Sequence, residues 1–203
     1  MISIIDYDAG NIKSVEKAFN HFGCVVSVTR DAKEILASDK VILPGVGSFG
    51  DAMNQLEKYD LIGVIKDFAA TGKPFLGICL GLQLLFEESE ESPGVSGLSL
   101  LKGKILRFPD KEGFKIPQIG WNSLELKNKG RLFKGIEDGS FVYFVHSYYL
   151  KAEDPSIVTA TSQYAARVDA SVESANIFAC QFHPEKSSDV GLAMIKNFID
   201  LQV

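Results

Sequence analysis

The chain has 203 residues, of which 46% are hydrophobic and 23% are charged, and its formal net charge is −5. This length suits one large domain or two small ones with a buried core, and the composition is ordinary for a globular protein. The acidic balance, without a cluster of lysines and arginines, argues against binding to nucleic acid or to an anionic membrane surface. No apolar run reaches the roughly 18–20 residues that a membrane-spanning helix needs.

The first half of the sequence alternates short apolar runs with segments of helical periodicity. Strands are expected at ISIID, CVVSV, KVILPG and KPFLGI. Helices are expected at NIKSVEKAFNHFG with Asn11 as N-cap, at DAKEILAS, at DAMNQLEKYDLIGVIKDFAATG with a break near Asp60, and at LGLQLLFEES. This alternation predicts βαβ units and a parallel sheet.

The pattern changes after Glu91. A loop is expected at ESPGVSGLS, and strands follow at KGKILRF, QIGWNSLEL, SFVYFVHSYYL, SIVTATSQY and NIFACQFHP. A helix at SSDVGLAMIKNFIDL closes the chain, with Ser187 or Ser188 as its cap. The sequence therefore predicts an α/β fold with a mixed, mainly parallel central sheet flanked by helices, and additional antiparallel strands in the second half. Without a repeat or a linker, residues 1–203 are expected to form a single domain.

The stretch GICLG places Cys79 between two glycines, where an expected strand meets an expected helix. A cysteine is a useful nucleophile only as an accessible thiolate. A sharp strand-to-helix turn lifts the side chain above the strand ends and aims the helix N-terminus at the sulfur. Gly77 and Gly81 remove the Cβ atoms that would clash in such a turn. The stretch therefore indicates a cysteine nucleophile elbow, in which the N–H of Leu80 can face a developing oxyanion; the alternative is a buried apolar cysteine.

The three cysteines, Cys24, Cys79 and Cys180, are too few and uneven for a disulfide framework, so a reducing cytoplasm is expected. The start, MISIIDYDAGN, is expected to be a first strand and not a signal peptide, because acidic residues follow it and no basic segment precedes it. No metal site is expected, since C-x-x-C and histidine pairs at zinc spacing are absent. Cys24 and Cys180 lack flanking glycines and are expected to be small buried residues.

A nucleophilic cysteine needs a base, and the chain has three histidines. His21, near the end of the first helix, fits a capping or surface role, and His146, inside VYFVHSYY, fits a structural one. His183 ends an apolar strand in CQFHPEKS, before a proline that stops pairing. Glu185 follows two residues later, so carboxylate and imidazole can share one side of an extended edge. His-Pro-Glu alone also fits a surface turn, but together with GICLG it indicates a triad with Cys79.

A second glycine-rich turn follows the strand in KVILPGVGSFGDAM. In a parallel sheet it would open at the same carboxyl-end rim as GICLG. Gly45 and Gly47 allow backbone N–H groups to turn toward a ligand, as an oxyanion donor must. Phosphate binding is the alternative, although the stretch lacks the lysine and the spacing of a P-loop.

Together, GICLGLQLLFEES, QFHPEKS and LPGVGSFGDAM resemble the class I glutamine amidotransferases. Within that family, the chain more closely resembles the glutaminase subunits of imidazole glycerol phosphate synthases. Three stretches carry this narrower resemblance: IIDYDAGNIKSVEKAF, PQIGWNSL and YFVHSYY. The similarity runs from about residue 2 to residue 200. The stretch DYDAGN departs from the pattern at Asp8, where a glycine or a similarly small residue is expected.

The resemblance implies that Cys79 attacks the side-chain amide of L-glutamine. His183 would activate the thiol and protonate the leaving ammonia, with Glu185 orienting it, and the thioester would be hydrolysed to glutamate. No cofactor is implied. The resemblance also assigns oxyanion and substrate contacts to Gly45, Gly47, Leu80, Gln83, Ser147 and Tyr148.

The resemblance further implies a partner. Ammonia would pass to a (β/α)8-barrel cyclase in a heterodimer, which makes imidazole glycerol phosphate and aminoimidazole carboxamide ribotide in histidine biosynthesis. Asn11, Trp121 and Tyr143 match positions that face this cyclase.

Three other functions fit parts of the sequence. A glutaminase subunit of another amidotransferase, such as pyridoxal phosphate synthase, shares the triad, but QIGWNSL and YFVHSYY argue against it. A cysteine hydrolase or redox sensor would act without an ammonia-using partner. A non-catalytic binding subunit should lack a member of the triad, whereas all three are present.

Overall fold

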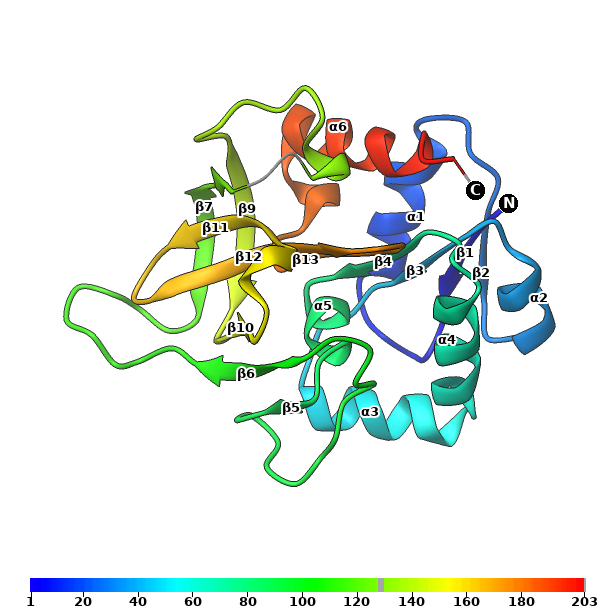
Figure 1. Ribbon diagram of the computed structural model, residues 1–203, viewed down its shortest axis with the longest axis horizontal. Helices are drawn as coiled ribbons and strands as arrows, with labels where there is room; N and C mark the ends of the chain where they lie inside the picture. The colour runs from blue at the N-terminus through cyan, green and yellow to red at the C-terminus, as the bar shows by residue number, and fades with distance from the viewer. Residues whose placement is uncertain (128–129, 203) are drawn as a thin grey trace.

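The computed structural model describes residues 1–127 and 130–202, and its core is a twisted sheet with helices on both faces (Figure 1). Among these residues, eight strands form the central sheet in the order β2-β1-β3-β4-β13-β12-β11-β8. The first five are parallel to one another, and each of the last three is antiparallel to the strand before it in this order. The bounds are β1 Ile2–Ile5, β2 Val26–Thr29, β3 Lys40–Leu43, β4 Phe75–Ile78, β8 Glu125–Leu126, β11 Val158–Gln163, β12 Arg167–Ser174 and β13 Ile177–Cys180.

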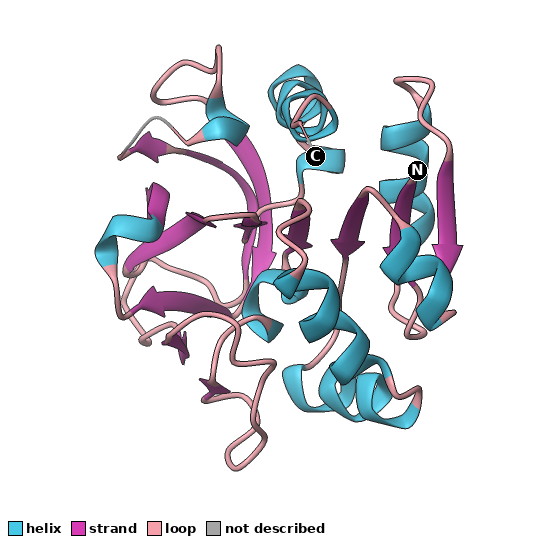
Figure 2. Cartoon of the chain, turned by 45° about the vertical axis from the view of Figure 1, so that its right-hand side comes forward, coloured by secondary structure: helices cyan, strands magenta, loops and turns pink. Residues whose placement is uncertain are grey.

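Helices cover the parallel strands from both sides, as Figure 2 shows. On one face α1 packs against α6, with the rings of Phe19 and Phe198 in an edge contact at 6.2 Å. On the other face α3 contacts both α4 and α5, and α2 contacts α4. The predicted α/β fold with a mixed, mainly parallel sheet is confirmed. The helices are α1 Ile12–Asn20, α2 Ala32–Ala37, α3 Phe49–Lys58, α4 Leu61–Ala70, α5 Leu80–Leu84 and α6 Ser188–Ile199.

The parallel strands are buried on both faces, which explains their nearly continuous apolar sequences. In β3, for example, Val41 and Leu43 belong to the core under α3 and α4, whereas Ile42 belongs to the core under α1 and α6. The predicted helix break is also confirmed. Asp60 has a φ of 55°, and this left-handed residue separates α3 from α4.

The second half adds two small sheets. One has the order β10-β6-β5 and the other pairs β7 with β9. The stretch SFVYFVHSYYL, expected as one strand, is divided at Ser147 into β9 and β10, which belong to different sheets. The helix expected at LGLQLLFEES is shorter than predicted, because α5 ends at Leu84 and the last residues of the stretch form β5. Short helical turns lie at η1 Arg131–Phe133, η2 Pro155–Ile157 and η3 Pro184–Lys186. The strands are β5 Glu88–Ser89, β6 Gly103–Arg107, β7 Gln118–Ser123, β9 Phe141–His146 and β10 Tyr148–Ala152.

The strand β12 was not expected from the sequence, because RVDASVES contains charged residues and does not read as an apolar strand. Asp169, in its middle, is 5% exposed. Its carboxylate accepts a hydrogen bond from the N–H of Ala152 at 3.0 Å, which satisfies the buried charge. Within the two described ranges, no helix has the length and apolar character to cross a membrane.

Candidate active site

Cys79 lies in the turn between β4 and α5, at the carboxyl end of the parallel strands. Its φ of 55° and ψ of −108° are unusual for a residue with a side chain, a conformation that costs about 1–3 kcal/mol. The N–H of Cys79 donates to the carbonyl of Cys180 at 2.8 Å, so the neighbouring strand β13 helps to hold the turn. This is the geometry of a nucleophile elbow, as the sequence predicts.

The two glycines of the elbow are required by close approaches of the backbone. A Cβ atom on Gly77 would lie 2.8 Å from the carbonyl oxygen of Gly81. A Cβ atom on Gly81 would lie 1.9 Å from the carbonyl oxygen of Leu43, at the end of β3. The elbow therefore packs directly against the strand that leads into the second glycine-rich turn, residues 44–47, called the PGVG turn below.

We expect Gly81→Ala to destabilise the chain by about 3 kcal/mol or more, because the new methyl group meets fixed backbone. Urea unfolding measures the effect. The control is Gly63→Ala in α4, where no described atom lies within 4 Å of the added Cβ. That variant should gain about 0.5–1 kcal/mol from higher helix propensity. Equal stability of the two variants would contradict the packing argument.

His183 and Glu185 form a buried pair beside the elbow. Nδ1 of His183 donates to Oε1 of Glu185 at 2.7 Å, and the two side chains are 1% and 0% exposed. Burial lowers the pKa of His183, but the Cys79 sulfur and the Glu185 carboxylate favour the charged ring and raise the pKa to about 10. Glu185 thus occupies Nδ1 and leaves Nε2 for the sulfur. Nε2 is buried and makes no hydrogen bond with any described residue, and the contribution of the Cys79 sulfur to the raised pKa of the ring indicates that the two groups are near one another.

Ser187, one of the two serines expected to cap α6, occupies the N-cap position, but its hydroxyl makes no capping bond there. Its Oγ donates to the carbonyl of His183 at 2.6 Å and accepts the N–H of Tyr143 at 2.9 Å. The N–H of His183 in turn donates to the carbonyl of Tyr143 at 2.9 Å. These bonds fasten the backbone of the histidine to β9.

A cavity of about 290 Å³ opens above the elbow. It brings together most of the oxyanion and substrate residues that the resemblance implies, although they come from three parts of the chain. Gly45 is not among the described residues that line the cavity, but its carbonyl accepts the N–H of Leu80, which does line it, at 3.3 Å. Gly47 has a φ of 103°, which only glycine adopts readily. The expected residues that line the cavity are Gly47, Cys79, Leu80, Gln83, Ser147 and Tyr148.

His146 also borders the cavity, but its environment fits the structural role expected for it. It is 6% exposed, and its Nδ1 donates to the carbonyl of Tyr148 at 2.8 Å. Burial lowers its pKa to about 4, with smaller effects from that bond and from His183. The ring is therefore neutral at physiological pH and packs against Phe108 and Phe144.

The structure pairs two of the three residues that were expected to face a partner. Trp121 on β7 and Tyr143 on β9 are direct cross-strand neighbours, with ring centroids 6.1 Å apart. The same face of these strands carries Ile119 and Phe141, which are 63% and 57% exposed, beside Trp121 at 53%. The side chain of Asn11, the third of these residues, donates to Glu185.

The comparison with known families follows this geometry. The model of the family described as Glutamine amidotransferase class-I matches residues 3–201. The chain belongs to this family.

Relatives and solved structures agree with this assignment. Two relatives described as imidazole glycerol phosphate synthase subunit HisH, from Bacillus mycoides (strain KBAB4) and Bacillus cereus (strain AH187), are each 53% identical over 199 residues. Each match covers 98% of this chain and 93% of the relative, which confirms the narrower resemblance. A crystal structure of a glutamine amidotransferase shares the fold with a TM-score of 0.75 at 16% identity, covering 97% of this chain and 98% of that one. The glutaminase domain of Trypanosoma brucei CTPS, with bound acivicin, does so with a TM-score of 0.70 at 15% identity, covering 100% and 94%.

Two polar residues of this amidotransferase site were not found from the sequence. Gln181 is fully buried, and its Nε2 faces the Cys79 sulfur at 3.8 Å. Its Oε1 accepts from Nε2 of Gln83 at 3.1 Å, while the same nitrogen donates to the carbonyl of Tyr148 at 3.0 Å. The chain of amides thus connects the sulfur to the cavity wall. The available signal was the position of Gln181 two residues before His183 in the same extended segment.

Glu91 is the second such residue. It lines the cavity, and one carboxylate oxygen accepts the N–H of Phe49 at the start of α3 at 2.8 Å. Its sequence context, a run of acidic residues in a loop, gives no sign of a site. Its charge makes the cavity suitable for a ligand with an ammonium group.

Proposed function

We propose that this chain is the glutaminase subunit of an imidazole glycerol phosphate synthase, which releases ammonia from L-glutamine for histidine biosynthesis. The observation that carries the proposal is the arrangement of Cys79, His183 and Glu185 at one cavity. The relatives at 53% identity, named as subunits of that synthase, support the choice of partner reaction.

The geometry supports acyl transfer in two steps. The thiol of Cys79 has already given its proton to Nε2 of His183, whose pKa is raised to about 10, and Sγ attacks the side-chain amide carbon of glutamine. When the C–N bond breaks, His183 returns this proton to the nitrogen, and ammonia leaves. His183 then takes a proton from water, which attacks the thioester to give glutamate and restore the thiol. Glu185 holds Nδ1–H throughout, so that the other nitrogen faces the sulfur.

The tetrahedral intermediates need N–H donors for their oxyanion, and Gly47 and Leu80 are the proposed sources. The N–H of Leu80 is engaged with the carbonyl of Gly45 at 3.3 Å, a long bond that an oxyanion must displace. A rearranged PGVG turn would release this donor. This supports a resting state of low activity.

Glutamine would lie along the cavity wall. Its amino-acid end would lie against the backbone of Ser147 and Tyr148, with the ammonium group of that end facing the carboxylate of Glu91. The side chain of Gln83 is fixed by Tyr148 and Gln181, so it presents a rigid polar surface to the substrate.

The proposed partner is a cyclase subunit with a (β/α)8-barrel fold in a heterodimer. The apolar face formed by Ile119, Trp121, Phe141 and Tyr143 fits a protein interface, because exposed aromatic side chains that cluster in this way commonly anchor partners. The proposal includes a single amidotransferase domain over residues 1–203 and a cytoplasmic location. The free thiols of Cys24, Cys79 and Cys180 suit a reducing compartment.

Glutamate release by the chain alone, with the cyclase subunit, and with the cyclase and its nucleotide ligand tests the proposal. We expect slow hydrolysis by the chain alone and strong stimulation by the liganded partner, because uncoupled ammonia release would waste glutamine. The synthase subunit of pyridoxal phosphate synthase serves as the control partner and should not stimulate. Full activity without a partner would contradict the coupling, and no glutamate under any condition would contradict the glutaminase assignment.

A further inference from the structure

The side chain of Asn11 does not cap the helix that it precedes. Asn11 occupies the N-cap position of α1, and its carbonyl accepts the N–H groups of Ser14 and Val15 at 3.1 and 3.4 Å. An asparagine here ordinarily accepts a further N–H through its side-chain oxygen. Within the described chain it makes no such bond. Instead, Nδ2 donates to Oε1 of Glu185 at 2.6 Å, across 174 residues of sequence.

The Glu185 carboxylate depends on very few donors. The side chain is 0% exposed, and Oε1 receives both Nδ1 of His183 and the amide of Asn11. Oε2 is buried without a hydrogen-bond partner in residues 1–127 and 130–202. A buried carboxylate is unfavourable unless donors compensate its charge, and hydrogen bonds to charged groups are the strong ones. Asn11 therefore supplies one of the two side-chain donors that hold this carboxylate.

We propose that Asn11 is a positioning residue of the triad, which fixes the Glu185 carboxylate in the rotamer that orients His183. The inference rests on the proposed glutaminase function. Asn11 acts through Glu185 and contacts neither the sulfur nor the cavity.

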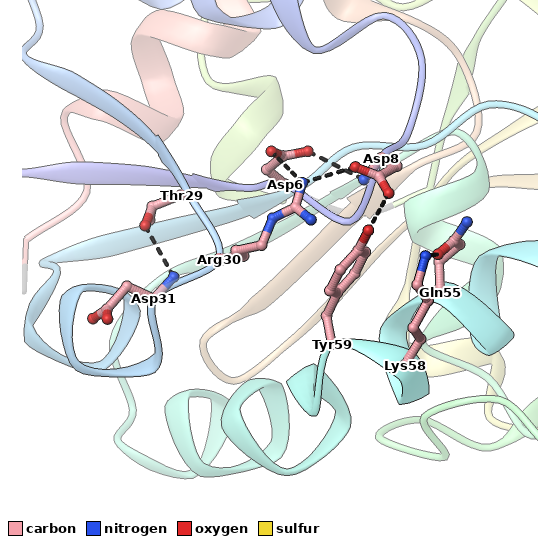
Figure 3. A network of polar contacts seen from close by, with 8 residues as sticks. All are labelled: Asp6, Asp8, Thr29, Arg30, Asp31, Gln55, Lys58 and Tyr59. Carbon is pink, nitrogen blue, oxygen red and sulfur yellow. Dashed lines mark hydrogen bonds and ion pairs between the residues drawn. The ribbon is translucent and has the colours of Figure 1, made fainter.

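The loop that carries Asn11 is fastened at its start by a polar network (Figure 3). Nη2 of Arg30 donates to Asp6 and Asp8 at 2.7 and 2.8 Å, and the hydroxyl of Tyr59 also donates to Asp8. The guanidinium lies 4.1 Å from the centre of the Tyr59 ring. The φ of Asp8 is 65°, which explains why a glycine is expected there, and the network compensates for the larger side chain.

The same loop borders the PGVG turn. A Cβ atom on Gly10 would lie 2.7 Å from a methyl group of Val46, and the hydroxyl of Tyr7 donates to the carbonyl of Pro44 at 2.7 Å. Residues 7–11 therefore lie between the turn that carries Gly47 and the carboxylate of the triad. A fixed loop keeps Asn11 in place, and a displaced loop would disturb both parts of the site.

The resemblance gives Asn11 a different role, as a contact with the cyclase. The two roles differ in their kinetic consequences. A partner contact affects the affinity for the cyclase, and a saturating concentration of cyclase corrects its loss. A positioning residue affects the chemical step, which no concentration of partner restores.

The first test measures glutamine hydrolysis by Asn11→Ala in the complex with saturating, liganded cyclase. We expect kcat to fall about 10- to 100-fold, the worth of a hydrogen bond to a charged group. The KM for glutamine, the affinity for the cyclase and ammonium-dependent synthesis should be unchanged. Asn20→Ala, an exposed residue at the other end of the same helix, is the matched control and should equal the wild type. Trp121→Ala provides the contrast, since saturating cyclase should restore its kcat.

The second test uses Asn11→Asp and the pH dependence of kcat. At neutral pH the new carboxylate repels Glu185, so this variant should be slower than Asn11→Ala. As the pH falls, the two carboxyl groups can share a proton and the protonated one donates again, so its kcat relative to Asn11→Ala should rise. A wild-type kcat for Asn11→Ala at saturating cyclase, or an Asn11→Asp profile parallel to that of Asn11→Ala, would overturn the inference. If the wild type itself released no glutamate, the proposed function would fail instead.

Discussion

Replacing Cys79 with alanine is expected to abolish glutamine-dependent synthesis and to leave synthesis from added ammonium salts intact. The sulfur is the atom that forms the thioester, so kcat for glutamine hydrolysis should fall by about 10⁴- to 10⁶-fold. Ammonium supplies the same ammonia to the cyclase without the triad. The measurement compares the two nitrogen sources in one preparation of the heterodimer, with glutamate and product followed separately.

Cys180→Ala is the matched control for this experiment. Cys180 is also a buried free thiol, on the strand next to the elbow, and burial raises its pKa well above that of an ordinary cysteine. It therefore stays neutral and unreactive. We expect the control to lose some stability but to keep its glutaminase activity. Loss of both syntheses in Cys79→Ala would instead make Cys79 a residue needed for folding or assembly.

Local chemistry explains why the fold class and the triad were predictable. GICLG and HPE each combine special backbone geometry with a reactive side chain within a few residues, and β3 and β4 are short apolar runs separated by the helices α3 and α4. The elbow alone predicts a close backbone approach at Gly81, but it does not predict that the approached atom belongs to Leu43 of β3.

The remaining features depend on contacts between distant parts of the chain. Gln181 reaches the sulfur across 102 residues, and Asn11 reaches Glu185 across 174. Asn11 was expected as a helix cap and as a contact with the cyclase, and Gln181 had no expected role. The strand β12 was missed for a similar reason, because the bond that satisfies Asp169 comes from Ala152 on another strand. Such roles become visible only when the fold brings the partners together.

The expected result for His183→Asn is a fall in kcat of about 10³- to 10⁴-fold at neutral pH, with ammonium-dependent synthesis intact. Asparagine preserves polarity at this position but cannot accept and return a proton at the sulfur. Because the base is gone, the pH profile of the residual activity should differ from that of the wild type. A variant that kept the wild-type pH profile would contradict the role of His183 as the base. Glu185→Ala should be milder, because the imidazole remains.

The same variant tests the charge of His183 through stability. The folded-state pKa of about 10 lies above the ordinary value of about 6.5, so between these pH values the folded chain holds a proton that the unfolded chain has lost. The stabilisation is complete below about pH 6.5 and disappears as the pH rises through 10. Urea unfolding at several pH values should therefore show the wild type losing its advantage over His183→Asn as the pH increases. A constant difference would mean that the ring is neutral in the folded chain, and the thiol would then need a proton transfer, not a preformed ion pair, to become nucleophilic.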